Sequence, residues 1–481
     1  MTLAWLWTGI AFVYQLLIVW FVLTLLRRPR EPKGMLAWIL ALILLPVLGP
    51  LLFIVFGEPR KRRHRRRRKK RLRRLREQLT PADKSLARTP APDVETLRME
   101  LQTLSRLGQR LGAYSAVGGN DAKVYQDAEQ TFLALQLAME AAESHIHMEY
   151  YIWQPDDTGQ AVRDLLIAKA KQGVACRVLL DYIGCFHMSR SFIQPMRDAG
   201  VEVAFAMPYV PLRGISRMNF RNHRKIVVID GKVGFTGSQN IGDEYAGRPT
   251  ALGKWRDTHM KLAGPVVRQL QDVFVSDWHY TTKQQLSGVA CFPPIDEQGE
   301  HIVQVVPSGP DQREPVMHQL LFAAVSAARR SVCVITPYFV PDQAMLMALQ
   351  SASYRGARVR LIVPSCSDHR LVLWAGRSYY EDLSLAGIEI YEHDSVMLHS
   401  KVLIIDREWA LVGSANMDQR SFLINYELTS VLYSKSLAGE LYQDFEQVRS
   451  QCRQVTAREI HNRSFLESVL LGTARLTSPI L

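Results

Sequence analysis

The chain has 481 residues and a net charge of +13, and this length is enough for two or three domains. The positive excess is local, because residues 60–76 hold 14 of the 59 lysines and arginines and no acid, which leaves 45 basic against 46 acidic residues elsewhere. A nearly neutral body argues against nucleic-acid binding, which calls for basic residues around the functional site. The six cysteines form no CxxC pair or metal-ligand spacing, so we expect neither a disulfide framework nor a zinc site.

Two apolar stretches come first in the chain. Met1–Leu26 and Met35–Phe56 contain no charged residue, and each exceeds the roughly 20 residues that cross a bilayer. A cleaved signal peptide is the alternative for the first stretch, but it lacks a basic start and a second apolar stretch follows it. We therefore expect two transmembrane helices. Because the second contains Pro46, Gly49 and Pro50, a kinked or re-entrant segment is its alternative.

Basic clusters flank the second apolar stretch, with four basic residues in 27–34 and 14 in 60–76. With two full spans these clusters face opposite sides, and the positive-inside rule then places the larger one, with the rest of the chain, in the cytoplasm. A re-entrant second segment places both clusters there. The tract also suits anionic lipid headgroups, at about 1 kcal/mol per basic residue near the surface. Its alternative is a solvated tract that only sets the topology.

After a proline-containing linker at 80–93, apolar spacing predicts helices at 94–111 and 128–143. An internal repeat follows, in which strand, helix, strand and a helix end entering a strand recur in the same order. The matched segments are 145–153 with 332–340, 160–172 with 343–354, 174–181 with 357–364, and 198–202 with 385–389. Strands alternating with helices predict two homologous α/β domains, related by a pseudo-twofold axis, with mixed sheets covered by helices.

Each half closes with the pattern H-x-K-x4-D-x6-G-S-x-N. Its members are His223, Lys225, Asp230, Gly237, Ser238 and Asn240, and then His399, Lys401, Asp406, Gly413, Ser414 and Asn416. The apolar runs 226–229 and 402–405 predict a strand buried on both faces, followed by a turn and a returning strand. The histidine and lysine of each copy share one face of the chain. The alternative, a buried histidine beside a lysine, is disfavoured because six positions recur 176 residues apart.

An imidazole, an ammonium, a hydroxyl and a carboxamide together suit a tetrahedral anion such as phosphate. The pattern resembles the HKD motif of the phospholipase D superfamily, and the resemblance covers about residues 115–455. Four further segments make the chain similar to the bacterial cardiolipin synthases, which often carry two N-terminal membrane segments. These segments are YYIW at 150–153, QVVPSGPD at 304–311, TPYF at 336–339 and GSANMDQRSF at 413–422.

The resemblance implies phospholipase D-like domains at 113–300 and 301–463, preceded by membrane segments at 1–58 and a connecting region at 59–112. It assigns nothing to the tail 464–481. It also implies a multi-pass protein of the bacterial inner membrane, with its catalytic body in the cytoplasm.

The implied reaction uses no metal or cofactor and joins two phosphatidylglycerol molecules into cardiolipin. By resemblance, His223 attacks phosphorus and forms a phosphohistidine, and His399 serves as acid and then base. The equivalent motifs leave the reverse assignment open. Phosphate oxygens would be held by the remaining motif side chains. These are Lys225, Lys401, Ser238, Asn240, Ser414 and Asn416.

Four acids complete the candidate site. The resemblance places Asp257 on His223 and Glu427 on His399, where each would fix the imidazole tautomer. Ordinary surface acids are the alternative. Asp230 and Asp406 belong to the motif, but their position after a buried strand favours a turn-holding role over chemistry.

Three functions remain open on this basis. The first is the phosphatidyltransferase, with phosphatidylglycerol, cardiolipin and anionic membrane lipids as ligands and no nucleic acid. The second uses the same covalent chemistry with water as acceptor, in a lipase or a membrane-tethered nuclease. The third is a non-catalytic lipid-binding scaffold, which two intact motifs disfavour. A homodimer is compatible with each, although no residue requires one.

Overall fold

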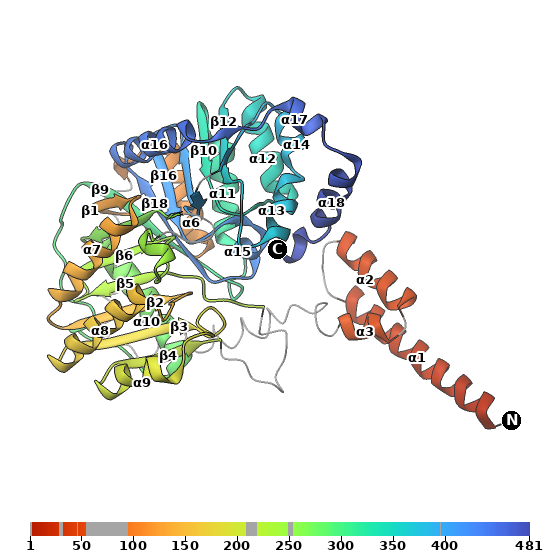
Figure 1. Ribbon diagram of the computed structural model, residues 1–481, viewed down its shortest axis with the longest axis horizontal. Helices are drawn as coiled ribbons and strands as arrows, with labels where there is room; N and C mark the ends of the chain where they lie inside the picture. Colours follow the sequence, from red (N-terminus) through yellow and green to blue (C-terminus); the bar gives the residue numbers. More distant parts are fainter. Residues whose placement is uncertain are drawn as a thin grey trace. The chain divides into compact units, whose positions relative to one another are not determined.

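The computed structural model describes residues 2–27, 32–45, 47–53, 95–207, 219–248, 254–394 and 396–481 (Figure 1). They divide between two compact units. The smaller contains the N-terminal helices and the larger contains the α/β body. The basic tract 60–76 and the linker 80–93 lie outside the described residues, so what the sequence predicts of them stays a prediction.

The first helix of the smaller unit, α1 (Thr2–Leu26), exposes apolar side chains along its length, among them Trp7 and Phe12. Its segment Trp7–Leu26 has a mean hydropathy of 2.3, and among the described helices it alone is long and apolar enough to cross a membrane. A second full span is not confirmed. Helix α2 (Pro32–Leu44) has 13 residues, a length of about 20 Å, whereas the apolar core of a bilayer is about 30 Å thick.

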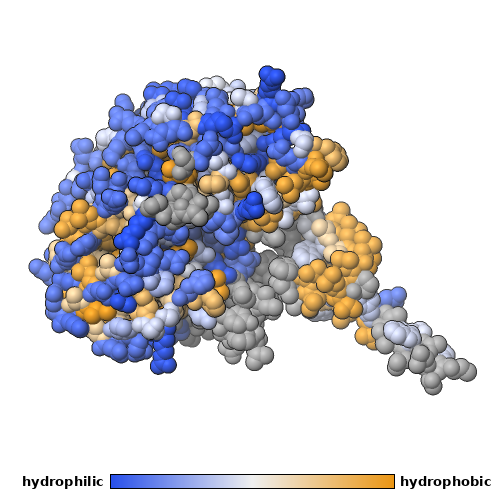
Figure 2. Space-filling model, in the orientation of Figure 1, coloured by the Kyte–Doolittle hydropathy of each residue, from blue (hydrophilic) through white to orange (hydrophobic). Residues whose placement is uncertain are grey.

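The second apolar stretch is interrupted after α2. Val47 has a φ of 68°, and the short helix α3 (Leu48–Leu52) begins there. A Cβ atom on Gly49 would clash with the carbonyl oxygen of Ala41, so glycine is what allows α3 to approach α2. This broken segment fits the kinked or re-entrant alternative. Figure 2 shows apolar side chains on the visible face of α2.

One mixed sheet of 15 strands runs through the α/β body (Figure 1), in the order β19-β13-β12-β10-β15-β16-β18-β9-β1-β8-β6-β5-β2-β3-β4. The first half supplies β1 (Val117–Tyr125), β2 (His145–Tyr150), β3 (Ala175–Asp181), β4 (Glu202–Ala206), β5 (Ile226–Ile229), β6 (Val233–Gly237) and β8 (His259–Ala263). The second half supplies β9 (His301–Ser308), β10 (Ser331–Ile335), β12 (Arg358–Pro364), β13 (Glu389–His393), β15 (Val402–Ile405), β16 (Trp409–Gly413), β18 (Glu427–Tyr433) and β19 (Arg453–Gln454).

The strand order repeats on either side of the β1–β9 junction. Strands β2, β3 and β4 are parallel, as are β10, β12 and β13, and the motif strands β5 and β15 join each set antiparallel. The predicted pseudo-twofold α/β repeat is thus confirmed. The halves are not separate sheets, because β1 and β9 pair directly, with Val117 opposite Val303. Domain boundaries at 113–300 and 301–463 stay a prediction.

Helices cover both faces of the sheet, as predicted. One face carries α7 (Ala128–Glu140), α8 (Asp157–Lys171) and α9 (Arg190–Asp198) in the first half, and α6 (Met99–Leu111), α11 (Val316–Ala327), α12 (Gln343–Tyr354), α13 (Arg370–Arg377) and α14 (Tyr380–Leu385) in the second. The opposite face carries α10 (Val266–Thr282) and α16 (Lys435–Ser450). Leu270 of α10 and Phe445 of α16 belong to one core that contains strand residues of both halves. The halves therefore share a core as well as a sheet.

The remaining elements lie near the ends of strands or of the chain. They are β7 (Lys254–Arg256) with β14 (Val396–Leu398), β11 (Phe339–Val340) with β17 (Met417–Asp418), α15 (Gln419–Leu423), α17 (Ala457–His461), α18 (Phe465–Arg475), η5 (Glu244–Ala246) and η6 (Ser478–Ile480). The tail 464–481, which the sequence left unassigned, forms α18 and η6. It is held to the second half by Arg475, which donates to Asp382 at 2.7 Å.

Candidate active site

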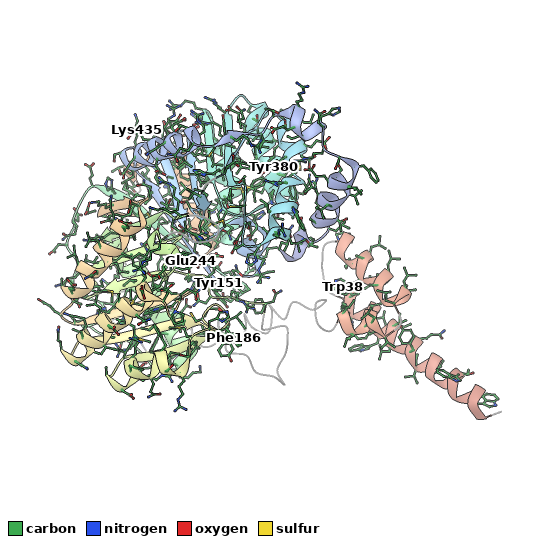
Figure 3. All side chains as sticks on the ribbon, viewed as in Figure 1. Trp38, Tyr151, Phe186, Glu244, Tyr380 and Lys435 are labelled. Atoms are coloured by element: carbon green, nitrogen blue, oxygen red, sulfur yellow. The ribbon has the colours of Figure 1, made fainter. Side chains whose placement is uncertain are left out.

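The two motif histidines line one cavity of about 380 Å³ in the α/β body. His223 lies just before β5 and His399 just before β15, so matching strands of the repeat bring them together. Figure 3 shows Tyr151, another lining residue, where the two halves meet. The sequence predicted that the two motifs share one site, and a single cavity lined by both histidines fits this prediction. The cavity is also lined by Asn240, Asn416, Arg221, Arg420, Tyr338 and Asp368.

Each histidine is held by an acid from the opposite half of the chain. His223 Nδ1 lies 2.9 Å from Glu427 Oε2, and His399 Nδ1 lies 2.7 Å from Asp257 Oδ1. All four side chains are buried. The sequence-based assignment, which placed Asp257 on His223 and Glu427 on His399, is therefore wrong in its pairing, although both acids do contact a motif histidine.

The pairing of each histidine with the acid of the opposite half follows from two local strand pairings between the halves. Strand β7 pairs in parallel with β14, and His399 N donates to Arg256 O at 2.8 Å, so Asp257 arrives beside His399. Reciprocally, Asn222 forms a β-bridge with Tyr426, and His223 N donates to Tyr426 O at 2.8 Å. That bridge puts the next residue, Glu427, beside His223. Each half of the site is thus completed by the other half of the chain.

Burial and the acids together set the charge of the two histidines. Burial lowers the pKa of His223 to about 4 and also lowers that of His399, although the facing acids oppose the change. Burial raises the pKa values of Glu427 and Asp257, but the facing imidazoles outweigh it and both values lie below the ordinary one. At neutral pH each pair is therefore a neutral imidazole with an ionised carboxylate. The imidazole donates Nδ1–H to the acid, and its Nε2 carries no proton.

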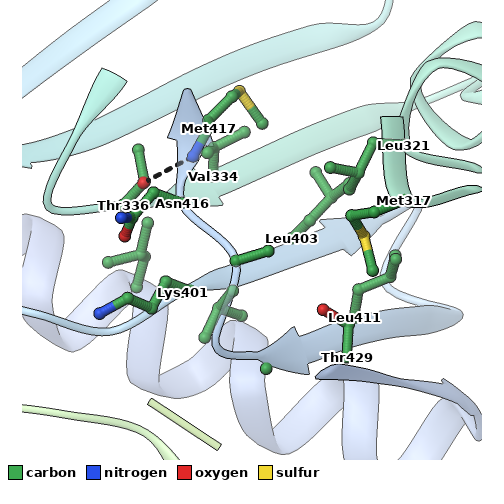
Figure 4. A pocket seen from close by; sticks show the side chains of 14 residues that line it. Met317, Leu321, Val334, Thr336, Lys401, Leu403, Leu411, Asn416, Met417 and Thr429 are labelled. Atoms are coloured by element: carbon green, nitrogen blue, oxygen red, sulfur yellow. Dashed lines mark hydrogen bonds between the residues drawn. The ribbon is translucent and has the colours of Figure 1, made fainter. Parts of the chain in front are cut away.

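The motif lysines are also buried. Lys225 Nζ donates to His223 O at 2.8 Å, and Lys401 Nζ donates to His399 O at 2.5 Å. Burial lowers the pKa of Lys225 to about 7 and that of Lys401 to about 8. Figure 4 shows Lys401 at the edge of a cavity of about 30 Å³, with its ammonium directed away from the leucine and methionine side chains that also line this cavity.

The asparagines and serines of the motifs have different positions. Asn240 and Asn416 line the cavity of the histidines, and the buried Oδ1 of Asn416 has no partner among the described residues. Ser414 Oγ instead donates to Glu427 Oε2 at 2.5 Å, and Ser238 Oγ donates to Thr258 O at 3.0 Å. The predicted phosphate-binding role thus suits the asparagines. The serine hydroxyls hold the segments that carry the acids.

The motif aspartates hold turns at the far ends of β5 and β15. Asp230 accepts backbone N–H groups of Glu143, Ser144 and His145 at 2.9, 2.7 and 2.8 Å. Asp406 accepts those of residues 329–331 in the same way. Although both aspartates belong to the motif, neither lines the cavity of the histidines, and the turn-holding role that their position favours fits these contacts.

Sequence reasoning missed Arg224, which lies between His223 and Lys225. Its buried guanidinium donates to Glu427 O at 3.1 Å and to Ser308 O at 3.0 Å, and it forms an ion pair with Asp277. It thereby ties motif 1 to the strand that carries Glu427. The middle position of H-x-K gave no signal, since the second motif has Ser400 there.

Paired H-x-K motifs on matching strands of a doubled α/β sheet, with both imidazoles on one cavity, define a phospholipase D-like enzyme. Residues 135–278 and 321–449 match the family described as cardiolipin synthase, PLD-like domain, and residues 16–58 match the family described as phospholipase D-nuclease N-terminal.

Full-length relatives give the same result. The chain is 37% identical to the cardiolipin synthase of Alkalihalophilus pseudofirmus, with 99% of this chain and 95% of that protein covered. It is 38% identical to cardiolipin synthase 2 of Bacillus anthracis, with 94% and 88% covered. The chain therefore belongs to the cardiolipin synthase family of enzymes. The N-terminal match and the apolar helix α1 indicate that it is membrane-associated.

The fold is also similar to that of a phosphatidylserine synthase from Haemophilus influenzae Rd KW20. The crystal structure of that protein aligns with a TM-score of 0.57 and 12% identity, covering 79% of this chain and 100% of the other. At this identity the likeness concerns the fold alone.

Proposed function

We propose that this protein is a phosphatidyltransferase that joins two phosphatidylglycerol molecules into cardiolipin and releases glycerol. The observation that carries the proposal is one cavity lined by two imidazoles, each hydrogen-bonded through Nδ1 to a buried carboxylate. The names of the relatives, which cover nearly the whole chain, support the choice of reaction. The proposal needs no metal or cofactor, because lysines and asparagines are available for the phosphoryl oxygens.

The first step forms a covalent intermediate. His223 Nε2 attacks the phosphorus of the donor lipid. A P–N bond forms while the bond from phosphorus to the oxygen of the headgroup glycerol breaks. His399 gives its proton to the leaving glycerol oxygen. Since the free enzyme holds His399 neutral, the proton must arrive with substrate; the negative charge of the bound phosphodiester raises the histidine pKa values.

The second step returns the enzyme to its starting state. A headgroup hydroxyl of the acceptor phosphatidylglycerol attacks the phosphohistidine, its proton passes to His399, and the P–N bond to His223 breaks. Lys225 and Lys401, with Asn240 and Asn416, stabilise the negative phosphoryl oxygens in both steps. One chain contains both motifs, so this reaction does not require a second copy.

For the membrane, the proposal is that α1 crosses the bilayer and the interrupted segment α2–α3 re-enters from the cytoplasmic side. This arrangement puts both basic clusters, at 27–34 and 60–76, in the cytoplasm, as the positive-inside rule asks. The catalytic body then follows on the same side, where anionic lipids attract the basic tract. Cysteine accessibility on either side of inverted vesicles tests the arrangement.

The activity is tested by reconstituting the full chain with labelled phosphatidylglycerol. Cardiolipin and glycerol are the expected products. Phosphatidic acid would instead indicate lipid hydrolysis. In a separate incubation with DNA, cleavage of the DNA would indicate a nuclease. His223→Ala and His399→Ala should each abolish turnover and leave the fold intact, with His461→Ala, on the exposed side of α17, as the matched control. Unaltered turnover in either active-site variant would rule out the two-histidine mechanism. A wild type that forms no product from lipid or DNA would leave the scaffold alternative.

A further inference from the structure

The tail that the sequence left unassigned carries an exposed apolar face. On helix α18, Phe465 is 81% exposed and Leu466 is 78% exposed, and Val469 and Leu470 are exposed as well. These four positions recur at the spacing of one helix face and span an arc of about 140°. The polar residue inside this arc, Thr473, donates its hydroxyl to Val469 O at 2.7 Å, so its donor is satisfied within the helix. The arc therefore carries no charge.

Another side of α18 is occupied by the protein itself. Leu471 and Ala474 are buried, and α18 packs against α13. The charged residues of the helix, Glu467 and Arg475, lie outside the apolar arc. Because Arg475 also donates to Asp382 at 2.7 Å, the helix is fixed to the second half. Folding thus leaves the apolar arc in water, and an exposed apolar patch of this kind indicates a partner.

Helix α18 is also close to the cavity of the two histidines. Figure 1 shows it beside α13, and α13 lines that cavity through Val372. The next residue back on α13, Leu371, is exposed and apolar. The chain that follows α18 returns to the cavity, since Leu481 lines it and accepts Arg420 N through its main-chain oxygen at 3.0 Å. Both the packing partner of α18 and the segment after it therefore contribute to the lining.

A lipid bilayer is the partner that these features fit. The chain is membrane-associated, and an uncharged face of phenylalanine, leucine and valine is typical of helices that lie in a membrane surface, with the apolar side about 5–10 Å deep. Figure 2 shows apolar side chains gathered over this end of the α/β body. A second copy of the chain fits less well. Four side chains on a helix about 16 Å long offer too little area for a stable dimer, which buries about 1,200 Å² or more.

We propose that the exposed face of α18 inserts into the lipid surface and holds the cavity of the histidines next to the bilayer that supplies its substrates. This inference rests on the proposed use of membrane phospholipids, whichever molecule accepts the phosphatidyl group. Helix α1 belongs to a separate compact unit, so a contact made by the α/β body itself is what orients the cavity. A headgroup then moves into the cavity while its acyl chains stay in the bilayer.

The partner is identified by crosslinking in the full chain, reconstituted in vesicles of phosphatidylglycerol and phosphatidylcholine. A diazirine-bearing residue replaces Leu466, and in a control protein it replaces Leu133, which is 57% exposed on α7. Figure 1 shows α7 and α18 at opposite ends of the α/β body. After illumination we expect a lipid adduct at position 466 and none at position 133. An adduct at position 466 to a second copy of the chain, or to water alone, would overturn the proposal.

The effect on turnover is measured with two forms of one substrate. Leu466→Ser combined with Leu470→Ser is the test variant, and Leu133→Ser combined with Leu137→Ser makes the same change at the same spacing on α7. With long-chain phosphatidylglycerol in vesicles, the test variant should be slower by about tenfold or more, the effect of no longer burying large apolar side chains. With short-chain phosphatidylglycerol that is monomeric in solution, it should keep its rate. The control should keep both rates.

An equal fall with both substrate forms at an unchanged melting temperature would overturn the membrane contact, as would no fall with either. If the test variant does not fold, the adduct at position 466 decides, because that protein keeps an apolar residue there. A wild type that forms the lipid adduct but makes no cardiolipin would support the contact and contradict the proposed function instead.

Discussion

The crossed pairing of histidines and acids is open to a kinetic test with Glu427→Gln and Asp257→Asn. If Glu427 serves His223, its replacement slows formation of the phosphohistidine. If Asp257 serves His399, its replacement affects the proton transfers to leaving group and acceptor. A phosphatidyl ester of p-nitrophenol separates the two effects, because this leaving group departs without protonation.

The size of the effect follows from the contacts of Glu427. Oε2 receives His223 Nδ1 and Ser414 Oγ, at 2.9 and 2.5 Å, and Oε1 receives Asn425 Nδ2 at 3.2 Å. A glutamine keeps its oxygen toward the two donors if its NH₂ faces Asn425, whose Oδ1 has no partner among the described residues and is available after an amide flip. The tautomer of His223 is then preserved and only the charge is lost. A hydrogen bond to a charged group contributes about 1.5–3 kcal/mol, so the burst rate should fall about 10- to 150-fold.

The assay is the burst of p-nitrophenol, with the labelled adduct on His223 trapped by rapid quenching. Glu427→Gln should slow this burst, and Asp257→Asn should leave its rate within a factor of about two, since no acid is required. With phosphatidylglycerol as donor, both variants should be slow. A burst slowed by Asp257→Asn and spared by Glu427→Gln would mean that each acid serves the histidine of its own half, and the crossed geometry would be refuted.

Three further outcomes are expected. Asp230→Ala leaves three backbone N–H groups without their acceptor, so the free energy of unfolding should fall by about 1–3 kcal/mol while kcat of the folded protein is kept; a lost kcat at full stability would contradict the turn-holding role. In pH profiles, kcat/KM should rise through about pH 4 as His223 loses its proton, and fall above about pH 7 to 8 as Lys225 and Lys401 lose theirs; a profile without the alkaline fall would show that the lysine charges are dispensable. Arg224→Met removes the guanidinium that forms an ion pair with the buried Asp277 and should destabilise the fold by about 3–5 kcal/mol, measured by denaturant unfolding; unchanged stability would exclude Arg224 as a tie between the halves.

The sequence was sufficient for features that depend on local pattern. The apolar runs 226–229 and 402–405 are the buried strands β5 and β15, and the matched segments recur as matched strands. Cys176 and Cys333, which stand in apolar runs of the sequence, are buried thiols on β3 and β10. In each case neighbours in the chain determine the environment, so spacing and composition carry the information.

The features that sequence missed depend on contacts between distant segments. The assignment of Asp257 to His223 used proximity along the chain, whereas the bridges β7–β14 and Asn222–Tyr426 bring the opposite acid to each histidine. The serine hydroxyls were expected to bind phosphate, because the motif does not show that Ser414 donates to Glu427 and that Ser238 donates to Thr258 O. For the second membrane segment, Pro46, Gly49 and Pro50 indicated a break as the alternative, but composition alone did not decide between a full span and the break seen at Val47.

The continuous sheet has a consequence for how lipids enter and leave. Strands β1 and β9 join the halves through backbone hydrogen bonds, and α10 and α16 pack over the seam. Hinge opening would have to break that ladder and expose the shared core, which makes it far more costly than moving loops. The donor lipid, the acceptor lipid and glycerol must therefore enter and leave at the edge of the cavity while the two halves stay joined. We therefore expect lipids to enter and leave without opening of the junction between the two halves.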